Sequence, residues 1–270
     1  PFASAQETTD KSKTDATDKS KSQTTEKTEK KAKPATKQPA VDLSKGATAE
    51  QVAESAIFSY SGFGGRDYLK QIRKTTIERG KIAIVNAEGK TEQANYERVI
   101  MRGDSLDKER IRLDQEYPSA RYALIYNKDK IFGIFNDAVF APREDASKSF
   151  QNQIWHGLEA LLRYKENGST LALAEREKLM GVEFYVLDVT DKQNRKTRFY
   201  ISTKTLRVML LEYTADGTKY RRKFYDYNYA QGTLVPFRTV LWANDKQIEE
   251  TTVQTISFGQ RVEENVFDES

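Results

Sequence analysis

The residues that could carry catalytic or metal chemistry are few in this chain. It holds one histidine, His156, and no cysteine. A lone histidine without cysteine lacks the ligand set of the usual zinc sites. A serine-histidine-aspartate triad would have to use His156, and the sequence contains no Gly-x-Ser-x-Gly nucleophile elbow. We therefore predict no catalytic residue, no metal site and no cofactor, and interpret His156 as a residue on a helix flank or at an interface.

Carboxylates are plentiful, with 40 Asp and Glu residues, so a pair of the glycosidase type stays open as the least favoured function. The separation of such a pair depends on the fold and cannot be read from the sequence. The glycine cluster Ser61–Gly65 is not followed by Lys-Ser or Lys-Thr, which excludes a P-loop. We interpret this cluster as a tight turn or a hinge.

Aromatic and basic residues gather at 220–229, where they could form a nucleic-acid platform, because rings stack on bases and cations bind phosphate. In a regular strand Tyr225, Tyr227 and Tyr229 would share one face. Asp226 interrupts the cluster, however, and the formal net charge of the chain is only +4. We therefore favour cross-strand aromatic packing and predict no nucleic-acid partner.

The scaffold for these residues is predicted to be mostly antiparallel sheet. From residue 182 to 258, segments rich in β-branched and aromatic residues alternate with short turn sequences. Connections this short join antiparallel neighbours, and a long twisted sheet curls. These predicted strands are Val182–Thr190, Arg198–Ser202, Leu206–Tyr213, Lys219–Asn228, Thr233–Ala243 and Gln247–Phe258.

Further strands are predicted earlier in the chain. They are Thr76–Val85, Lys90–Met101, Glu109–Gln115, Arg121–Tyr126 and Lys130–Phe135, with one more at Thr170–Ala174. Apolar residues lie on both faces of many strands. A sheet with one wet face alternates more cleanly, so the pattern indicates a covered outer face, an inner face that lines a ligand site, or a plain filled core.

Helices are predicted in two places. Thr48 and Gln51 match a capping box at the start of a first helix, and a short second helix follows the glycine cluster. The clearest helix runs from Ser147 to Lys165, because its apolar residues recur with helical spacing. These residues are Phe150, Ile154, Leu158, Leu161 and Leu162. A curved sheet and a helix with one apolar stripe predict that the helix covers the concave side.

The first 45 residues are predicted to differ from the rest. Ala3-Ser4-Ala5 matches the small-residue pattern that signal peptidase cleaves, so we expect an exported chain cut near Ala5, with truncation or an uncleaved anchor as alternatives. Residues 6–45 are mostly Lys, Thr, Ser, Asp, Glu, Ala and Gln and are expected to form a disordered linker. The linker is a spacer or, alternatively, an arm for an anionic surface. Residues 46–270 are expected to form a single half-barrel domain.

The layout of helix, strands and inserted helix resembles the periplasmic lipoprotein carrier superfamily (LolA/LolB-like). The local matches are the hairpin Tyr122–Phe135, the segment Gly232–Arg238 that leads into a strand, and the end of the chain through Glu250–Phe258 to Val262–Phe267. The resemblance implies an α+β, mainly β fold: a curved antiparallel sheet or unclosed β-barrel of about eleven strands, with helices capping the concave side. The linker before the first helix is a departure from the family.

A second departure concerns the functional arginine that this family carries on an early strand. Three arginines lie near the matching position, Arg102, Arg110 and Arg112. None of them stands out by sequence alone, which puts lipoprotein transfer in question more than lipid binding.

The resemblance implies an exported, non-enzymatic, monomeric carrier in the periplasm. It would bind lipid or the acyl chains of lipoproteins in an apolar cavity, with membrane-associated envelope proteins as further partners. Each buried CH₂ would contribute about 0.8 kcal/mol. The alternative is an envelope scaffold or adaptor with a filled core and a tethering tail, since periodicity does not separate the two. The expected cavity residues are Ile111, Leu113, Leu124, Tyr126, Phe150, Ile154, Leu158, Leu161, Leu162, Phe184, Val186, Phe199, Ile201 and Met209.

Overall fold

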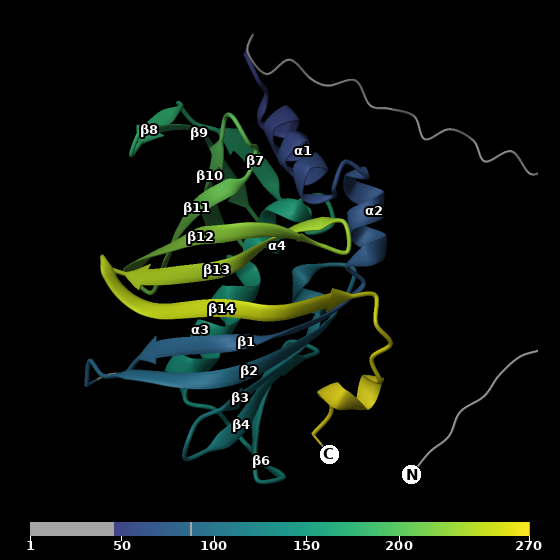
Figure 1. The fold of residues 1–270 in the computed structure, drawn as a ribbon, viewed down its shortest axis with the longest axis vertical. Helices are drawn as coiled ribbons and strands as arrows, with labels where there is room; N and C mark the ends of the chain where they lie inside the picture. Colours follow the sequence, from purple (N-terminus) through teal and green to yellow (C-terminus); the bar gives the residue numbers. More distant parts are fainter. Residues whose placement is uncertain (1–45, 87, 270) are drawn as a thin grey trace, which may run out of the picture. The chain divides into compact units, whose positions relative to one another are not determined.

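The computed structural model describes residues 46–86 and 88–269, which form one antiparallel sheet with helices packed on one side of it (Figure 1). The predicted signal-peptide remnant and linker, residues 1–45, lie outside the described residues, and the boundaries of the 46–270 domain stay a prediction. Among the described residues no helix is both long and apolar enough to cross a bilayer.

The sheet has 14 strands in the order β6-β5-β4-β3-β2-β1-β14-β13-β12-β11-β10-β9-β7, with β8 paired to β9. Its curved, unclosed form confirms the predicted fold, although the expected number of about eleven strands is too low. The short strands β6 and β8 were missed because three residues give no readable alternation. The strands are β1 (Thr75–Val85), β2 (Thr91–Met101), β3 (Arg110–Glu116), β4 (Arg121–Asn127), β5 (Lys130–Phe135), β6 (Ala138–Phe140), β7 (Thr170–Leu173), β8 (Glu177–Leu179), β9 (Val182–Thr190), β10 (Lys196–Ser202), β11 (Val208–Ala215), β12 (Thr218–Ala230), β13 (Thr233–Ala243) and β14 (Lys246–Phe258).

The centre of the sheet joins the two ends of the folded chain. Strand β1 pairs with β2 on one side and with the last strand, β14, on the other. This pairing aligns Thr75 with Met101, and the β2–β3 pairing aligns Met101 with Arg110. The residues just outside these strand ends, Arg73, Arg102 and Glu109, are therefore brought to the same end of the sheet.

Two helices precede the sheet. Helix α1 (Ala49–Tyr60) is capped by Thr48, whose side chain accepts a hydrogen bond from the amide of Gln51 while the Gln51 side chain accepts from the amide of Thr48, so the predicted capping box is confirmed. Helix α2 (Gly65–Ile72) follows directly. In the turn between them Gly62 has φ +57°, and a Cβ there would lie 2.1 Å from the carbonyl oxygen of Gly232. Only glycine fits this turn.

The single helix predicted for 147–165 is wrong: the structure has two. Helix α3 (Glu144–Trp155) ends at His156, and helix α4 (Leu158–Leu162) begins after Gly157. Gly157 has an extended backbone, with φ −82° and ψ −178°, which breaks the helical ladder. Both helices lie behind the sheet in Figure 1. The short 3₁₀ turns η2 (Leu106–Lys108) and η3 (Glu264–Phe267) complete the structure.

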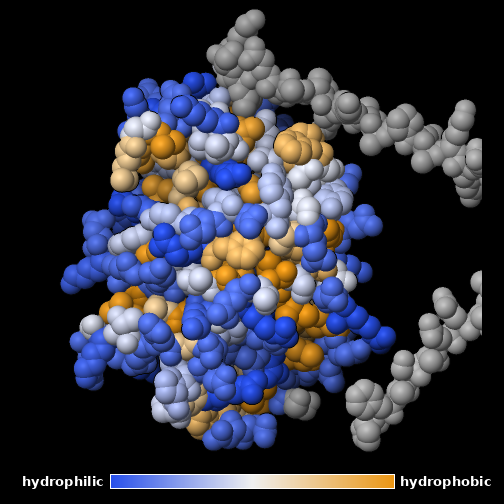
Figure 2. Space-filling model, in the orientation of Figure 1, coloured by the Kyte–Doolittle hydropathy of each residue, from blue (hydrophilic) through white to orange (hydrophobic). Residues whose placement is uncertain are grey.

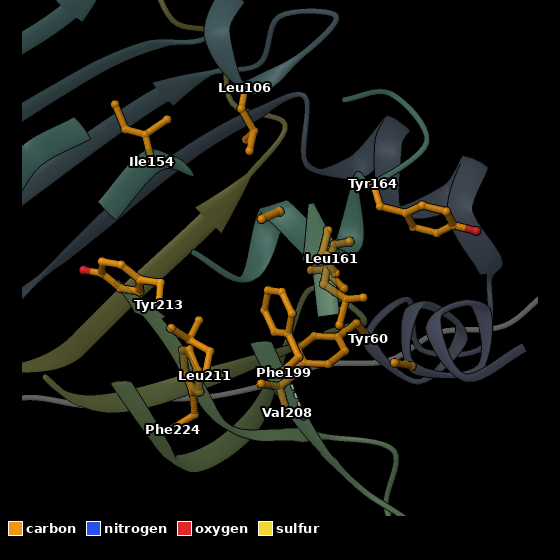
Figure 3. Close-up of a cluster of buried hydrophobic side chains, with 14 of the residues drawn as sticks. Tyr60, Leu106, Ile154, Leu161, Tyr164, Phe199, Val208, Leu211, Tyr213 and Phe224 are labelled. Atoms are coloured by element: carbon orange, nitrogen blue, oxygen red, sulfur yellow. Dashed lines mark hydrogen bonds between the residues drawn. The ribbon is translucent and has the colours of Figure 1, made fainter. Parts of the chain in front are cut away.

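The main apolar core lies between the sheet and the helices, and Figure 3 shows part of it around Leu161, Phe199 and Tyr60. Side chains on the other face of the sheet form two smaller clusters, one under η3 around Phe267 and one around Val186 on β9. The face seen in Figure 2 is mostly hydrophilic, with hydrophobic residues in separate groups. The outer face is thus partly covered, as the two-sided apolar pattern indicated.

The tyrosines of β12 do not share a face. Of Tyr225, Tyr227 and Tyr229, only Tyr227 packs against the main core, where its hydroxyl lies 2.6 Å from that of Tyr60. Asp226 has φ +53°, which interrupts the regular alternation of the strand. The ring of Tyr225 lies instead under the guanidinium of Arg238, which also donates to Asp226.

Candidate ligand-binding site

A cavity of about 190 Å³ lies between helix α3 and the concave face of the sheet. Its apolar lining comes from both sides. Phe150, Ile154 and Leu158 contribute from the helices, and Ile100, Ile111, Phe224, Val253 and Phe258 contribute from the strands. The volume is below the roughly 300–1,000 Å³ of typical small-molecule sites. The interior is therefore neither filled completely nor large enough for a whole lipid in this conformation.

The cavity is not purely apolar, which corrects the sequence prediction. Its lining also includes four arginines and three glutamates, which are Arg73, Arg98, Arg102, Arg222, Glu78, Glu109 and Glu159. The prediction overlooked Glu78, Arg98 and Arg222 because apolar residues lie on both faces of their strands, so the alternation does not reveal which face is inside. The other four lie on α4 or next to strand ends, where strand alternation gives no signal. The cavity therefore combines alkyl and aromatic surface with fixed charges.

The charged groups form a buried network at one end of the sheet. One carboxylate oxygen of Glu159, in the first turn of α4, lies 3.0 Å from Arg73 and 3.1 Å from Arg102. Arg102 also donates to both oxygens of Glu109 at 2.9 Å, and Arg163 pairs with Glu109 as well. Charge-assisted contacts of this kind are the strong hydrogen bonds of protein interiors.

The electrostatics of the network follow from its burial. Burial alone would raise the pKa of Glu159, but Arg102, Arg73 and Arg163 outweigh it, so the pKa lies below its ordinary value and the carboxylate is charged. Burial lowers the pKa of Arg73, and its attraction to Glu159 only partly offsets that effect. Arg73 is thus a cation whose lost hydration is incompletely replaced.

A second depression, of about 460 Å³, lies outside this network between α2, α4 and the segment after β2. Its lining carries six basic and four acidic residues. These are Arg66, Lys70, Arg73, Lys74, Arg102, Arg163, Asp67, Asp104, Glu159 and Glu166. We call this depression the outer groove and the 190 Å³ space the inner cavity. Arg73, Arg102 and Glu159 line both.

His156 lies at the end of α3, beside an open depression of about 620 Å³. Its Nδ1 atom is 2.7 Å from the hydroxyl oxygen of Thr197, and its ring stacks on Tyr213 with centroids 4.1 Å apart. Burial, together with Arg195, lowers the pKa of His156 to about 4. These contacts fit the interpretation of His156 as a packed helix-flank residue. Within 46–86 and 88–269 no group of His, Cys, Asp or Glu could hold a metal ion.

The fourteen expected cavity residues divide into four groups. The first lines the inner cavity and contains Ile111, Phe150, Ile154 and Leu158. The second is Leu162, which lines the outer groove. The third is packed in the main core and contains Leu113, Leu124, Tyr126, Leu161, Phe199 and Ile201. The fourth lies in the separate cluster on the other face of the sheet and contains Phe184, Val186 and Met209.

The fourth group faces away from the cavity because of strand alternation. On β9 the residues Tyr185, Leu187 and Val189 belong to the main core, so Phe184 and Val186 must point outward. Met209 has no partner in the β10–β11 register, which shifts between Tyr200 and Ile201. The structure therefore removes these three residues from the cavity lining.

Of the three arginines considered at the early strands, only Arg102 points into the inner cavity. Arg112 chelates Asp114 and donates to the carbonyl of Val266 in η3, and Arg110 pairs with Glu264. Arg98 on β2 also lines the cavity, 3.5 Å from Glu78 on β1. The register pairs Glu78 with Arg98 directly, which an alignment of the two predicted strands around their turn would have indicated.

Comparison with known proteins shows the fold but no sequence relative. No family model and no curated protein matches this chain. A LolA superfamily protein from Nitrosomonas europaea matches with TM-score 0.58 and 12% identity, over 82% of this chain and 98% of that one. A DUF1329 family protein from Desulfovibrio piger matches with TM-score 0.56 and 11% identity, over 82% and 97%.

A third structure, a domain from Vibrio parahaemolyticus described as an outer membrane lipoprotein-sorting protein, matches with TM-score 0.51 and 14% identity, over 82% of this chain and 97% of that one. All three comparisons cover nearly the whole of the other chain. At these identities they establish architecture and not activity. The chain described here has the LolA-like fold.

Proposed function

We propose that this protein is a non-enzymatic carrier that holds an alkyl chain of a lipid or lipoprotein beneath helix α3. The observation that carries the proposal is the inner cavity between α3 and the concave face of the sheet. The LolA-like fold supports it, and so does the lipoprotein-sorting description of the Vibrio domain. The periplasm is the proposed location, with the protein acting as a monomer and envelope membrane proteins as further partners.

Helix α3 is the element that would move. It is 12 residues long, yet only Phe150 and Ile154 of its residues are buried apolar side chains. Gln153 adds hydrogen bonds to Arg98 and Glu249 at 3.4 and 3.3 Å, which is near the upper limit for such contacts. Displacement of α3 would withdraw Phe150 and Ile154 and enlarge the cavity, so that an alkyl chain could replace them at about 0.8 kcal/mol per buried CH₂.

A matched pair of variants on β14 tests this proposal. Thr251 is buried and lines the inner cavity, whereas its neighbour Thr252 is exposed. Thr251→Phe should fill the cavity and weaken the binding of a fluorescent fatty-acid probe at least about tenfold, the factor that 1.4 kcal/mol gives. Thr252→Phe, with the same added volume outside, should bind like the wild type.

Native mass spectrometry of the purified protein provides an independent measurement, with an adduct of lipid mass as the expected result. If neither the probe nor any copurified lipid binds the wild type, the carrier function is refuted.

The second candidate is an envelope scaffold or adaptor. It is favoured by one observation: Leu113, Leu124, Tyr126, Leu161, Phe199 and Ile201, all expected to line a cavity, are packed in the main core. A scaffold would show no probe binding in either variant, together with capture of a protein partner. The carrier ranks first because side chains leave a cavity of about 190 Å³ unfilled beneath α3.

A further inference from the structure

The inner cavity and the outer groove share a wall of three charged residues, Arg73, Arg102 and Glu159. Antiparallel pairing positions the arginines, since Arg73 lies before β1, Arg102 follows β2, and Thr75 pairs with Met101. The amide of Arg102 also donates to the carbonyl of Lys74 at 2.9 Å. Glu159 reaches both guanidinium groups from the first turn of α4. The wall is therefore built from three elements that are distant in sequence.

The buried network that contains this wall has an excess of positive charge. Arg73, Arg102 and Arg163 are balanced only by Glu159 and Glu109, and all five side chains are at most 18% exposed. The nearby ion pairs Glu78–Arg98 and Arg222–Glu249 each contribute one positive and one negative charge, so they leave this excess of positive charge unchanged. Uncompensated buried charge is costly, so the site is suited to one further anion.

Two hydrogen-bond donors in the wall lack partners. The Nε atoms of Arg73 and Arg102 are buried and make no hydrogen bond. Arg73 as a whole is 8% exposed, and its Nη atoms already donate to Glu159 and to the carbonyl of Leu234. Glu159 uses one oxygen, Oε1, for both arginines. A ligand head with two or more oxygens could accept from the Nη atoms and from the unused Nε atoms together.

We propose that Arg73 and Arg102 bind the anionic head of a single-chain amphiphile, and that Glu159 occupies their guanidinium groups until the ligand displaces it. The proposal rests on the carrier function proposed above and adds the charge of the head group. Release of Glu159 joins the outer groove to the inner cavity, because Glu159 lines both. The alkyl chain then lies against Ile100, Val253 and Phe258 of the sheet, in the space beneath α3, with the head toward Lys70 and Lys74 of the groove.

The head is a carboxylate or a phosphate, as in a fatty acid or a phosphate monoester, and compounds with one twelve-carbon chain separate the alternatives. Affinities of dodecanoate, dodecyl phosphate and dodecanol are measured by displacement of a fluorescent probe. The wild type should bind at least one of the two anions about tenfold more tightly than dodecanol, and the stronger anion identifies the head group. Inorganic phosphate, which has the charge without the chain, should bind far more weakly than dodecyl phosphate.

Substitutions then assign the preference to the wall. Glu159→Gln removes the competing anion and should tighten binding of the preferred anion about tenfold, with dodecanol unchanged. Arg73→Gln should abolish the difference between the anions and dodecanol. Arg112→Gln is the matched control, because Arg112 lies on the other face of the sheet with Asp114 and Val266, and it should behave as the wild type.

The outcomes separate this proposal from the carrier function. Equal affinity for all three twelve-carbon compounds would overturn the anion site and leave the carrier function standing. The anion site would also be overturned, with the carrier function left standing, if Glu159→Gln binds the anion no more tightly than the wild type. This test remains valid even if the Arg73→Gln variant fails to fold. If none of the three compounds binds, and neither the fluorescent probe nor any copurified lipid binds, both proposals are overturned.

Discussion

Helices α3 and α4 come from one continuous apolar pattern, but they are attached to the sheet very differently. In the short α4, Leu161 and Leu162 are 0% and 1% exposed. Just after it, Arg163 donates to the carbonyl of Gly103 at 2.6 Å. Helix α3 is more than twice as long and buries only Phe150 and Ile154 as apolar anchors. In Figure 3 Leu161 lies close to Phe199 and Tyr60, and Ile154 lies away from that group.

This difference divides the proposed binding site into a part that stays fixed and a part that can move. Helix α4 holds Glu159 in the charged wall, and α3 covers the inner cavity from the other side of Gly157. Elements with few buried contacts are the ones that open locally below the global unfolding energy. We therefore expect α3 to open while α4 and the sheet stay folded.

The largest expected effect comes from truncating the anchor of α4. Leu161 is fully buried in the main core, so Leu161→Ala should lower the free energy of unfolding by about 3–5 kcal/mol. Urea denaturation followed by circular dichroism measures the change. A loss below about 0.5 kcal/mol, the size typical of a surface position, would show that α4 is no more firmly attached than α3.

The next effect concerns pH and the end of α3. The pKa of His156 is lowered to about 4 in the fold by burial and by Arg195, against an ordinary value of 6.5. Between these values the unfolded chain binds a proton that the native protein does not. Stability should therefore fall as pH decreases from about 6.5 to about 4, by up to about 3 kcal/mol, and this contribution should level off below pH 4.

The contribution of His156 is isolated by comparison with His156→Gln. The pKa values of carboxylates such as Glu54 and Asp188 are also lowered in the fold. Protonation of these groups therefore also reduces the stability of the protein in the lower part of the same pH range. Their contribution is common to both proteins, so the difference between the two curves reports the histidine. Parallel curves between pH 4 and 6.5 would contradict the assignment.

The curved antiparallel sheet could be predicted from the sequence, because the composition of each strand and the residues of each short turn are signals that lie within the segment itself. The short connection between the predicted strands Arg121–Tyr126 and Lys130–Phe135 illustrates this, since it joins β4 and β5 with Lys128 and Asp129 at positive φ. The apolar stripe of 147–165 was also read correctly as facing the sheet. The break at Gly157 was missed because the spacing of the leucines continues through it, although glycine within a helical pattern is itself a signal of a break.

The charged interior could not be predicted in the same way. Arg73, Arg102 and Glu159 come together only because three separate elements meet at one end of the sheet. The sequence also does not show which face of a strand points toward the cavity. Strand β9, for example, carries Val186 on one face and Leu187 on the other, and both are fully buried. The prediction assigns Phe184 and Val186 to the wrong face of β9, because a strand that is apolar on both faces gives no signal of which face lies inside.

A smaller effect is expected for truncating the anchor of α3. Ile154 lines the inner cavity and is 6% exposed, so Ile154→Ala should cost about 2 kcal/mol, the lower end for such a change. The same variant should bind the fluorescent fatty-acid probe at least as tightly as the wild type, because it enlarges the cavity. Isothermal titration and urea denaturation measure both quantities. A stability loss equal to that of Leu161→Ala would remove the contrast between the helices.

The smallest effect is a difference in local opening within the unmodified protein. The amide of His156 donates to the carbonyl of Asn152 in α3, and the amide of Arg163 donates to that of Glu159 in α4. If α3 opens by itself, the His156 amide should exchange with deuterium at least about tenfold faster than the Arg163 amide, a gap of about 1.4 kcal/mol. Equal exchange of the two amides in the free protein would mean that the helices open together, and the cover over the cavity would have to be sought elsewhere.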